Sequence, residues 1–172
     1  MDPSRITRIK RVSAALSVVV TVLTAALAAL YIVASFLAPG PLYAFSPTPI
    51  EWTPTLRAAV FAIGAVPFAV ALFAMGTAAR LFATFARGDV FEPRTGALLS
   101  RIGAAVLVGV ALSILAPVAA GTVVANHMGG GAVSLTVGWE DVWAASLALL
   151  FIVTGWVLRE AAAIAADHKA IV

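Results

Sequence analysis

The chain has 172 residues, of which 62% are apolar and only 11% are charged. Soluble globular domains are about 45–50% apolar and about 25% charged, so a water-soluble fold of this composition would expose more apolar surface than it could bury. The absence of cysteine excludes disulfides, thiolate nucleophiles and cysteine-ligated metals. The net charge of +3 comes from basic residues beside apolar stretches, where we expect contact with anionic lipid headgroups and no direct contact with nucleic acid.

Four long apolar stretches predict four transmembrane helices within one membrane domain, residues 1–172. We place the spans at about 12–38, 58–82, 100–125 and 141–160. A helix rises 1.5 Å per residue and needs about 20 residues to cross a hydrocarbon core of about 30 Å, which each span provides. The predicted fold class is therefore an all-α integral membrane protein, a four-transmembrane-helix bundle.

The distribution of lysine and arginine predicts the orientation of the chain. Of the eleven cations, ten fall at the N-terminus, in or beside the loop 83–98, or around the tail 161–172, and only Arg57 lies on the other side. Under the positive-inside rule both termini are cytoplasmic and loops 39–57 and 126–140 face outward. We expect the protein to reside in the inner (plasma) membrane of a bacterium, in contact with membrane lipid.

The outer loops carry two local patterns. Five of the nine prolines fall within 39–54, which excludes a regular helix there. Residues 132–137 alternate at period two, as a short strand does. We expect this stretch to form a short extracytoplasmic strand that pairs with residues 47–52.

Small and hydroxylated residues form two stripes at helical spacing. They are Ser13, Ser17, Thr21 and Thr24 in the first span, and Ala105, Gly109, Ser113 and Gly121 in the third. Such stripes allow close helix packing and hydrogen bonds between helices. Since no ionisable residue belongs to either stripe, we interpret them as packing seams; the alternative is the wall of a polar conduit.

The sequence lacks the residue patterns that catalysis or metal binding requires. No charge falls in the central two-thirds of any span, which disfavours a proton-coupled transporter. His127 and His168 lie on opposite sides of the predicted membrane and cannot share a metal. No nucleophile–histidine–acid spacing or glycine-rich phosphate loop is present. We therefore predict no enzyme activity, no cofactor and no metal.

The cytoplasmic loop has the clearest local signals. Gly88 is placed to end the second helix in a left-handed conformation, and Pro93 suits the first turn of the third. Arg94 and Arg101 follow at an interval of seven, so they share a helix face. The last span is expected to continue as a helix into the tail.

These stretches resemble a bacterial membrane family known as domain of unknown function 2975. The matching positions are Gly88, Asp89, Phe91, Arg94, Ile102 and Gly103 in the loop, and Glu160, Ala161, Asp167, His168, Ile171 and Val172 in the tail. The resemblance implies four spans. It also implies a cytoplasmic partner with a helix-turn-helix fold, because genes of such proteins often neighbour one for a small repressor-like protein.

We accordingly expect a non-enzymatic interaction or regulatory protein that presents its cytoplasmic face to a partner. The expected surface consists of Arg87, Gly88, Asp89, Phe91, Arg94, Arg101, Glu160 and Asp167, with Glu160 and Asp167 pairing with its arginines. Two alternatives remain open. The arginines could serve only to orient the chain and contact lipid phosphate, or the protein could be a passive channel or small-solute transporter. The sequence does not decide whether the protein forms homo-oligomers.

Overall fold

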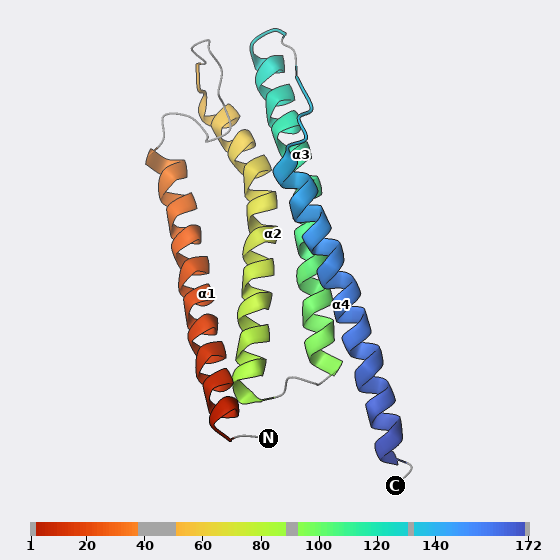
Figure 1. The fold of residues 1–172 in the computed structure, drawn as a ribbon. Helices are drawn as coiled ribbons and strands as arrows, with labels where there is room; N and C mark the ends of the chain where they lie inside the picture. Colours follow the sequence, from red (N-terminus) through yellow and green to blue (C-terminus); the bar gives the residue numbers. More distant parts are fainter. Residues whose placement is uncertain (1–2, 38–50, 89–92, 131–132, 171–172) are drawn as a thin grey trace.

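The protein is an all-α, four-span membrane protein. The computed structural model describes residues 3–37, 51–88, 93–130 and 133–170. It contains four helices, α1 (Pro3–Leu37), α2 (Pro54–Arg87), α3 (Pro93–His127) and α4 (Trp139–Ala170) (Figure 1). Each has a stretch long and apolar enough to cross a membrane. The predicted fold class is confirmed.

The helices form an open row in chain order. The backbones of α1 and α2, α2 and α3, and α3 and α4 approach one another, whereas in the described part of the chain α1 does not approach α3 or α4, nor α2 approach α4. The start of α1, the end of α2, the start of α3 and the end of α4 lie at the same end of the helices (Figure 1). We call it the basic end, because Lys10, Arg87 and Arg94 lie there.

The ends of α2 follow from its sequence. Thr53 precedes the helix in an extended conformation, and its Oγ1 accepts a hydrogen bond from the Leu56 N–H at 3.3 Å. Gly88 ends the helix with φ 98°, and its N–H donates to the Phe85 carbonyl at 3.0 Å. The predicted cap at Gly88 and the start of α3 at Pro93 are both confirmed.

Glycines bring α3 and α4 into backbone contact. A Cβ added to Gly96 would lie 2.6 Å from the carbonyl oxygen of Gly155, and one added to Gly103 would lie 2.5 Å from that of Ala148. No side chain larger than hydrogen fits at either position of α3. The two pairs repeat at an interval of seven on each helix, so they define one continuous seam.

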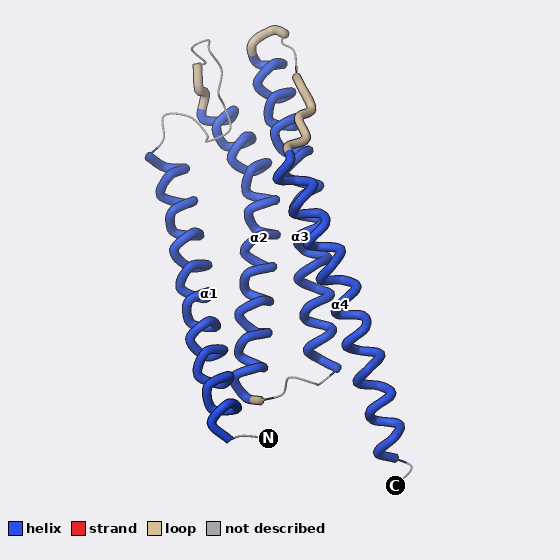
Figure 2. Tube along the Cα trace, viewed as in Figure 1, coloured by secondary structure: helices blue, strands red, loops and turns tan. Residues whose placement is uncertain are grey.

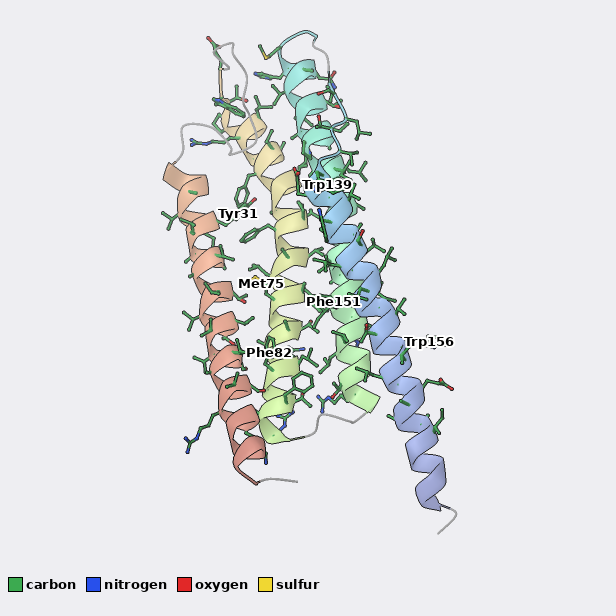
Figure 3. The ribbon with its side chains drawn as sticks, viewed as in Figure 1. Tyr31, Met75, Phe82, Trp139, Phe151 and Trp156 are labelled. Carbon is green, nitrogen blue, oxygen red and sulfur yellow. The ribbon has the colours of Figure 1, made fainter. Side chains whose placement is uncertain are left out.

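The packing between α2 and α3 uses larger side chains. Its two apolar clusters centre on Leu56, Val60 and Ala120 away from the basic end, and on Leu81, Leu98 and Ile102 toward it. Aromatic contact joins α1 to α2, since the ring of Tyr31, which Figure 3 labels, stacks on Phe68 with 4.1 Å between centroids.

Helix α4 is displaced along α3 toward the basic end. Its first turn lies beside the middle of α3, where the Ser113 hydroxyl is 3.3 Å from the Asp141 carboxylate. Beyond Ser113, residues 133–138 take the place of α4 beside α3 (Figure 2). The third-span stripe has no charged residue of its own, but α4 brings the Asp141 carboxylate beside it at Ser113.

The prediction of a strand in the second outer loop is wrong for the part of that loop that the structure describes. Residues 133–138 have no regular secondary structure. Val133 lies against α3, because a Cβ added to Gly121 would lie 3.3 Å from the Cγ1 atom of Val133. A strand needs a neighbour with unpaired backbone groups, and the neighbour here is a helix whose groups already bond internally. The proposed pairing partner extends into residues 38–50, outside the described part.

The first polar stripe divides into two parts. Ser13 is buried, and the Ser17 hydroxyl donates to the Ala79 carbonyl of α2 at 3.0 Å. Thr21 and Thr24 donate to carbonyls of their own helix. Only the half nearer the basic end is thus an interhelical seam. In the third span, Ala105 is buried and Gly109 faces Val70 of α2.

Candidate functional site: an arginine pocket at the basic end

Four arginines surround one cavity between α2 and α3. Arg80 and Arg87 come from α2, Arg94 and Arg101 from α3, and the cavity volume is about 470 Å³. On each helix the two arginines are seven residues apart, which is close to two turns and about 10.5 Å along the axis. Because the helices are antiparallel, the four side chains line the same cavity in two rows. We call this site the arginine pocket.

A threonine of α2 holds one arginine of the pocket in place. Thr84 and Leu98 are buried beneath the arginines. The Thr84 hydroxyl donates to the Arg80 carbonyl at 3.0 Å and accepts from Arg87 Nη2 at 3.3 Å. This contact holds one guanidinium at the pocket wall.

The pocket is strongly electropositive. All four arginines are exposed, and no aspartate or glutamate of the described residues lines the cavity. Arginine stays protonated at any physiological pH and presents a planar fork of N–H donors that matches carboxylate and phosphate. The remaining lining residues are alanine, threonine and leucine, which offer no general base. This arrangement can bind anions.

The structure brings together part of the predicted interaction surface. Arg87, Arg94 and Arg101 line the pocket, and Gly88 adjoins it, where an added Cβ would lie 3.0 Å from Lys10 Cε of α1. Glu160 is exposed on α4 and does not line the pocket.

Three predicted residues cannot be placed in the pocket. Asp89 and Phe91 fall outside the described residues, as does the side chain of Asp167. Sequence reasoning left Arg80 out of the surface. Its signal was available, since Arg80 precedes Arg87 by the same interval of seven that links Arg94 to Arg101.

Metal binding has no structural support among the described residues. No three histidine, aspartate or glutamate side chains there lie close enough together to hold an ion. Every buried side-chain nitrogen or oxygen in that part of the chain has a hydrogen-bond partner.

Comparison with known proteins gives one family. The model of a family described as "Protein of unknown function (DUF2975)" matches residues 40–172, which include α2, α3, α4 and the whole arginine pocket. No curated protein and no solved structure matches the chain.

Proposed function

We propose that this chain, which belongs to the DUF2975 family of proteins of unknown function, is a non-enzymatic docking protein of a bacterial inner membrane. In this proposal the arginine pocket faces the cytoplasm and binds an acidic segment of a cytoplasmic regulatory protein. The observation that carries the proposal is the convergence of Arg80, Arg87, Arg94 and Arg101 on one cavity.

The orientation in this proposal follows from charge. The basic end holds both termini and the arginine pocket, and cytoplasmic segments of membrane proteins are enriched in lysine and arginine. A cytoplasmic pocket is accessible to cytoplasmic proteins, whereas an outward-facing pocket in the same membrane is not.

The spacing of the arginines favours an acidic protein segment over a lipid headgroup. One phosphate is satisfied by one or two guanidinium groups in bidentate contact. The pocket offers two rows whose members are about 10.5 Å apart, which equals the distance between carboxylates two turns apart on a partner helix. A helix with acidic residues at such an interval can engage all four arginines at once. A helix-turn-helix regulator, which the family resemblance implies, is built of helices, on whose surface a pair of carboxylates at this interval can lie.

The test is charge reversal at Arg87 and Arg94 in the full chain. Tagged wild-type protein and the Arg87→Glu/Arg94→Glu variant are purified from the native host in mild detergent, and co-purifying proteins and lipids are identified by mass spectrometry. A matched control, Arg11→Glu/Arg159→Glu, makes the same charge change at the basic end with exposed arginines that do not line the pocket. We expect the pocket variant to lose a cytoplasmic protein that the control retains.

Orientation is measured in the same samples. The chain has no cysteine, so a single Gly130→Cys substitution gives a unique label site at the opposite end. It is expected to react with a membrane-impermeant reagent from outside in every variant. Retention of the partner by the pocket variant would contradict the proposal, as would loss of bound anionic lipid alone. If Gly130→Cys in the pocket variant is no longer labelled from outside, the arginines serve to set the orientation of the chain, and the proposal is contradicted.

A further inference from the structure

Aromatic residues mark both ends of the membrane span of α4. Trp139 and Trp143 lie in its first two turns, 72% and 56% exposed, and their rings meet edge to face. Trp156, which is 58% exposed, lies toward the basic end, three residues before Arg159 (Figure 3). Trp156 follows Trp139 by seventeen residues, which is about 25 Å along a helix. Tryptophan concentrates at the two surfaces of a hydrocarbon core about 30 Å thick, so α4 crosses the core between these residues.

Asp141 then lies at the membrane surface opposite the basic end, which we call the far surface. It belongs to the first turn of α4, as Trp139 does. Aspartate has a single methylene and cannot reach water from inside the core, whereas arginine has a long stem that can. Arg101 makes use of that stem, because it lies five residues from Gly96, which contacts Gly155 near the other end of the α4 span. The depth of Arg101 below that surface is roughly 7.5 Å.

The contacts of Asp141 carry the far surface across to the other helices. Its carboxylate is 3.3 Å from the Ser113 hydroxyl of α3. Both residues line a cavity of about 560 Å³ together with Phe68 of α2. Tyr31 of α1 stacks on Phe68, and tyrosine is enriched at membrane surfaces as tryptophan is. All four helices therefore meet the far surface at one level.

Helices α2 and α3 continue well past this level. Helix α2 begins fourteen residues before Phe68, and α3 ends fourteen residues after Ser113. Each of these lengths is about 21 Å. A bilayer is about 30 Å thick without its headgroups and about 40–45 Å with them, so each headgroup layer is about 5–8 Å. The ends of α2 and α3 thus extend beyond the headgroups.

The exposed side chains change in type at the far surface. Between the two surfaces, large apolar side chains are exposed on α3 and α4, namely Leu107, Val108, Leu149, Leu150 and Val153. In residues 54–60 of α2 and 116–127 of α3, every large apolar side chain is buried or half-buried. The exposed positions there hold Pro54, Thr55, Ala58, Pro117, Ala119, Thr122, Asn126 and His127. A helix that keeps its large apolar side chains inside has a surface suited to water, not to lipid.

These helix ends also have an apolar core of their own. Leu56, Val60 and Ala120 are buried together, and Trp52, Ile63, Val123 and Val124 pack against them. Residues 133–138 run along α3 back to Trp139, and Val133 lies against Gly121. Leu135 and Val137, which are exposed, are in the part of this segment nearest Trp139 and the headgroup layer.

We propose that the lipid bilayer contacts the protein with its far surface at the level of Tyr31, Ser113 and Asp141, and that Trp139 and Trp143 bind its headgroup layer. Beyond that level, residues 54–67 of α2 and 114–127 of α3 form a two-helix projection into water. This placement depends neither on the orientation of the chain nor on what the arginine pocket binds. It can therefore fail without the docking proposal, and the docking proposal can fail without it.

The test is the reactivity of single cysteines, which the cysteine-free chain makes unambiguous. Thr122→Cys and Ala104→Cys replace exposed residues of α3 that lie nine residues from Ser113 in opposite directions. They are 18 residues apart, which is about five turns, so they share one helix face. Each variant is reconstituted in nanodiscs of phosphatidylcholine and phosphatidylglycerol, whose two surfaces are both open to reagent. The rate of reaction with a membrane-impermeant maleimide is measured and divided by the rate for the same variant in SDS.

We expect Thr122→Cys to react at least about tenfold faster than Ala104→Cys, because the reactive thiolate forms in water and not in hydrocarbon. A second pair repeats the comparison on the neighbouring helices. Ala58→Cys, ten residues before Phe68 on α2, should react as fast as Thr122→Cys, and Leu149→Cys in the α4 span as slowly as Ala104→Cys. Equal rates for Thr122→Cys and Ala104→Cys, or protection of Ala58→Cys to the level of Leu149→Cys, would overturn the proposal.

Discussion

Helix α3 packs against its two neighbours in opposite ways. Toward α4 it presents Gly96 and Gly103, and the two backbones touch at Gly155 and Ala148. Toward α2 it presents large apolar side chains gathered in two clusters, with a cavity of about 560 Å³ between them. One interface has no space for a methyl group, and the other has space for a ligand.

The difference separates a fixed unit from an adaptable one. Within a membrane, helices gain little from hydrophobic burial because lipid tails are as apolar as leucine, and close backbone packing supplies much of the attraction. The α3–α4 pair is packed in this way. The α2–α3 interface leaves its middle open, and both the arginine pocket and the cavity of about 560 Å³ belong to it. The open space between the helices thus lies where the packing is loose.

The largest expected effect comes from closing the glycine seam. Gly103→Leu places a side chain where even a Cβ would lie 2.5 Å from the Ala148 carbonyl oxygen, so the helices must separate. We expect the free energy of unfolding in mixed micelles to fall by on the order of 3 kcal/mol.

The matched control is Gly109→Leu on the other side of the same helix. A Cβ there would lie 3.8 Å from Val70 Cγ1, an ordinary contact beside the cavity. We expect a change within about 1 kcal/mol, because leucine is also the better helix former. Equal destabilisation by both substitutions would show that the two interfaces do not differ in this way.

A smaller effect is expected from Val60, the most buried large side chain of the described residues. Val60 is 1% exposed and packs with Leu56 and Ala120 in the cluster away from the basic end. Val60→Ala removes the equivalent of two methylene groups and leaves a cavity in the packed cluster, so we expect a loss of about 1 kcal/mol from lost van der Waals contacts. Val66→Ala on the same helix, where the valine is 51% exposed, should change the free energy of unfolding little in the same titration. Equal losses from the two substitutions would argue against specific packing at Val60.

The features that the sequence predicts correctly are those set by residues close together in the chain. The four spans follow from length and apolar composition, and the Gly88 cap and the Pro93 start follow from residues within one helical turn. Three of the four pocket arginines were also recognised, because their spacing of seven lies within a short stretch around the same turn.

The pairing of the helices could not be predicted. In water the apolar stripe of a helix marks its buried face, but in lipid the outward face is equally apolar, so periodicity does not identify the neighbour. The seam glycines Gly96 and Gly103 therefore looked like any other small residues. The displacement of α4, which brings Asp141 to Ser113, depends on the register of that seam and is not encoded near either residue.

The smallest effect concerns the hydrogen bond that joins Ser113 to Asp141 across α3 and α4. A serine hydroxyl has one proton, and its nearer acceptor is the Val110 carbonyl at 2.8 Å, compared with 3.3 Å for the Asp141 carboxylate. We therefore expect Ser113→Ala to lower the free energy of unfolding by about 0.6 kcal/mol or less, the average for such bonds in membranes. Ser146→Ala, whose hydroxyl bonds only within α4, is the control. A loss of more than about 1 kcal/mol for Ser113→Ala, with no change for Ser146→Ala, would contradict this expectation and show that the Asp141 carboxylate, and not the Val110 carbonyl, holds the hydroxyl proton.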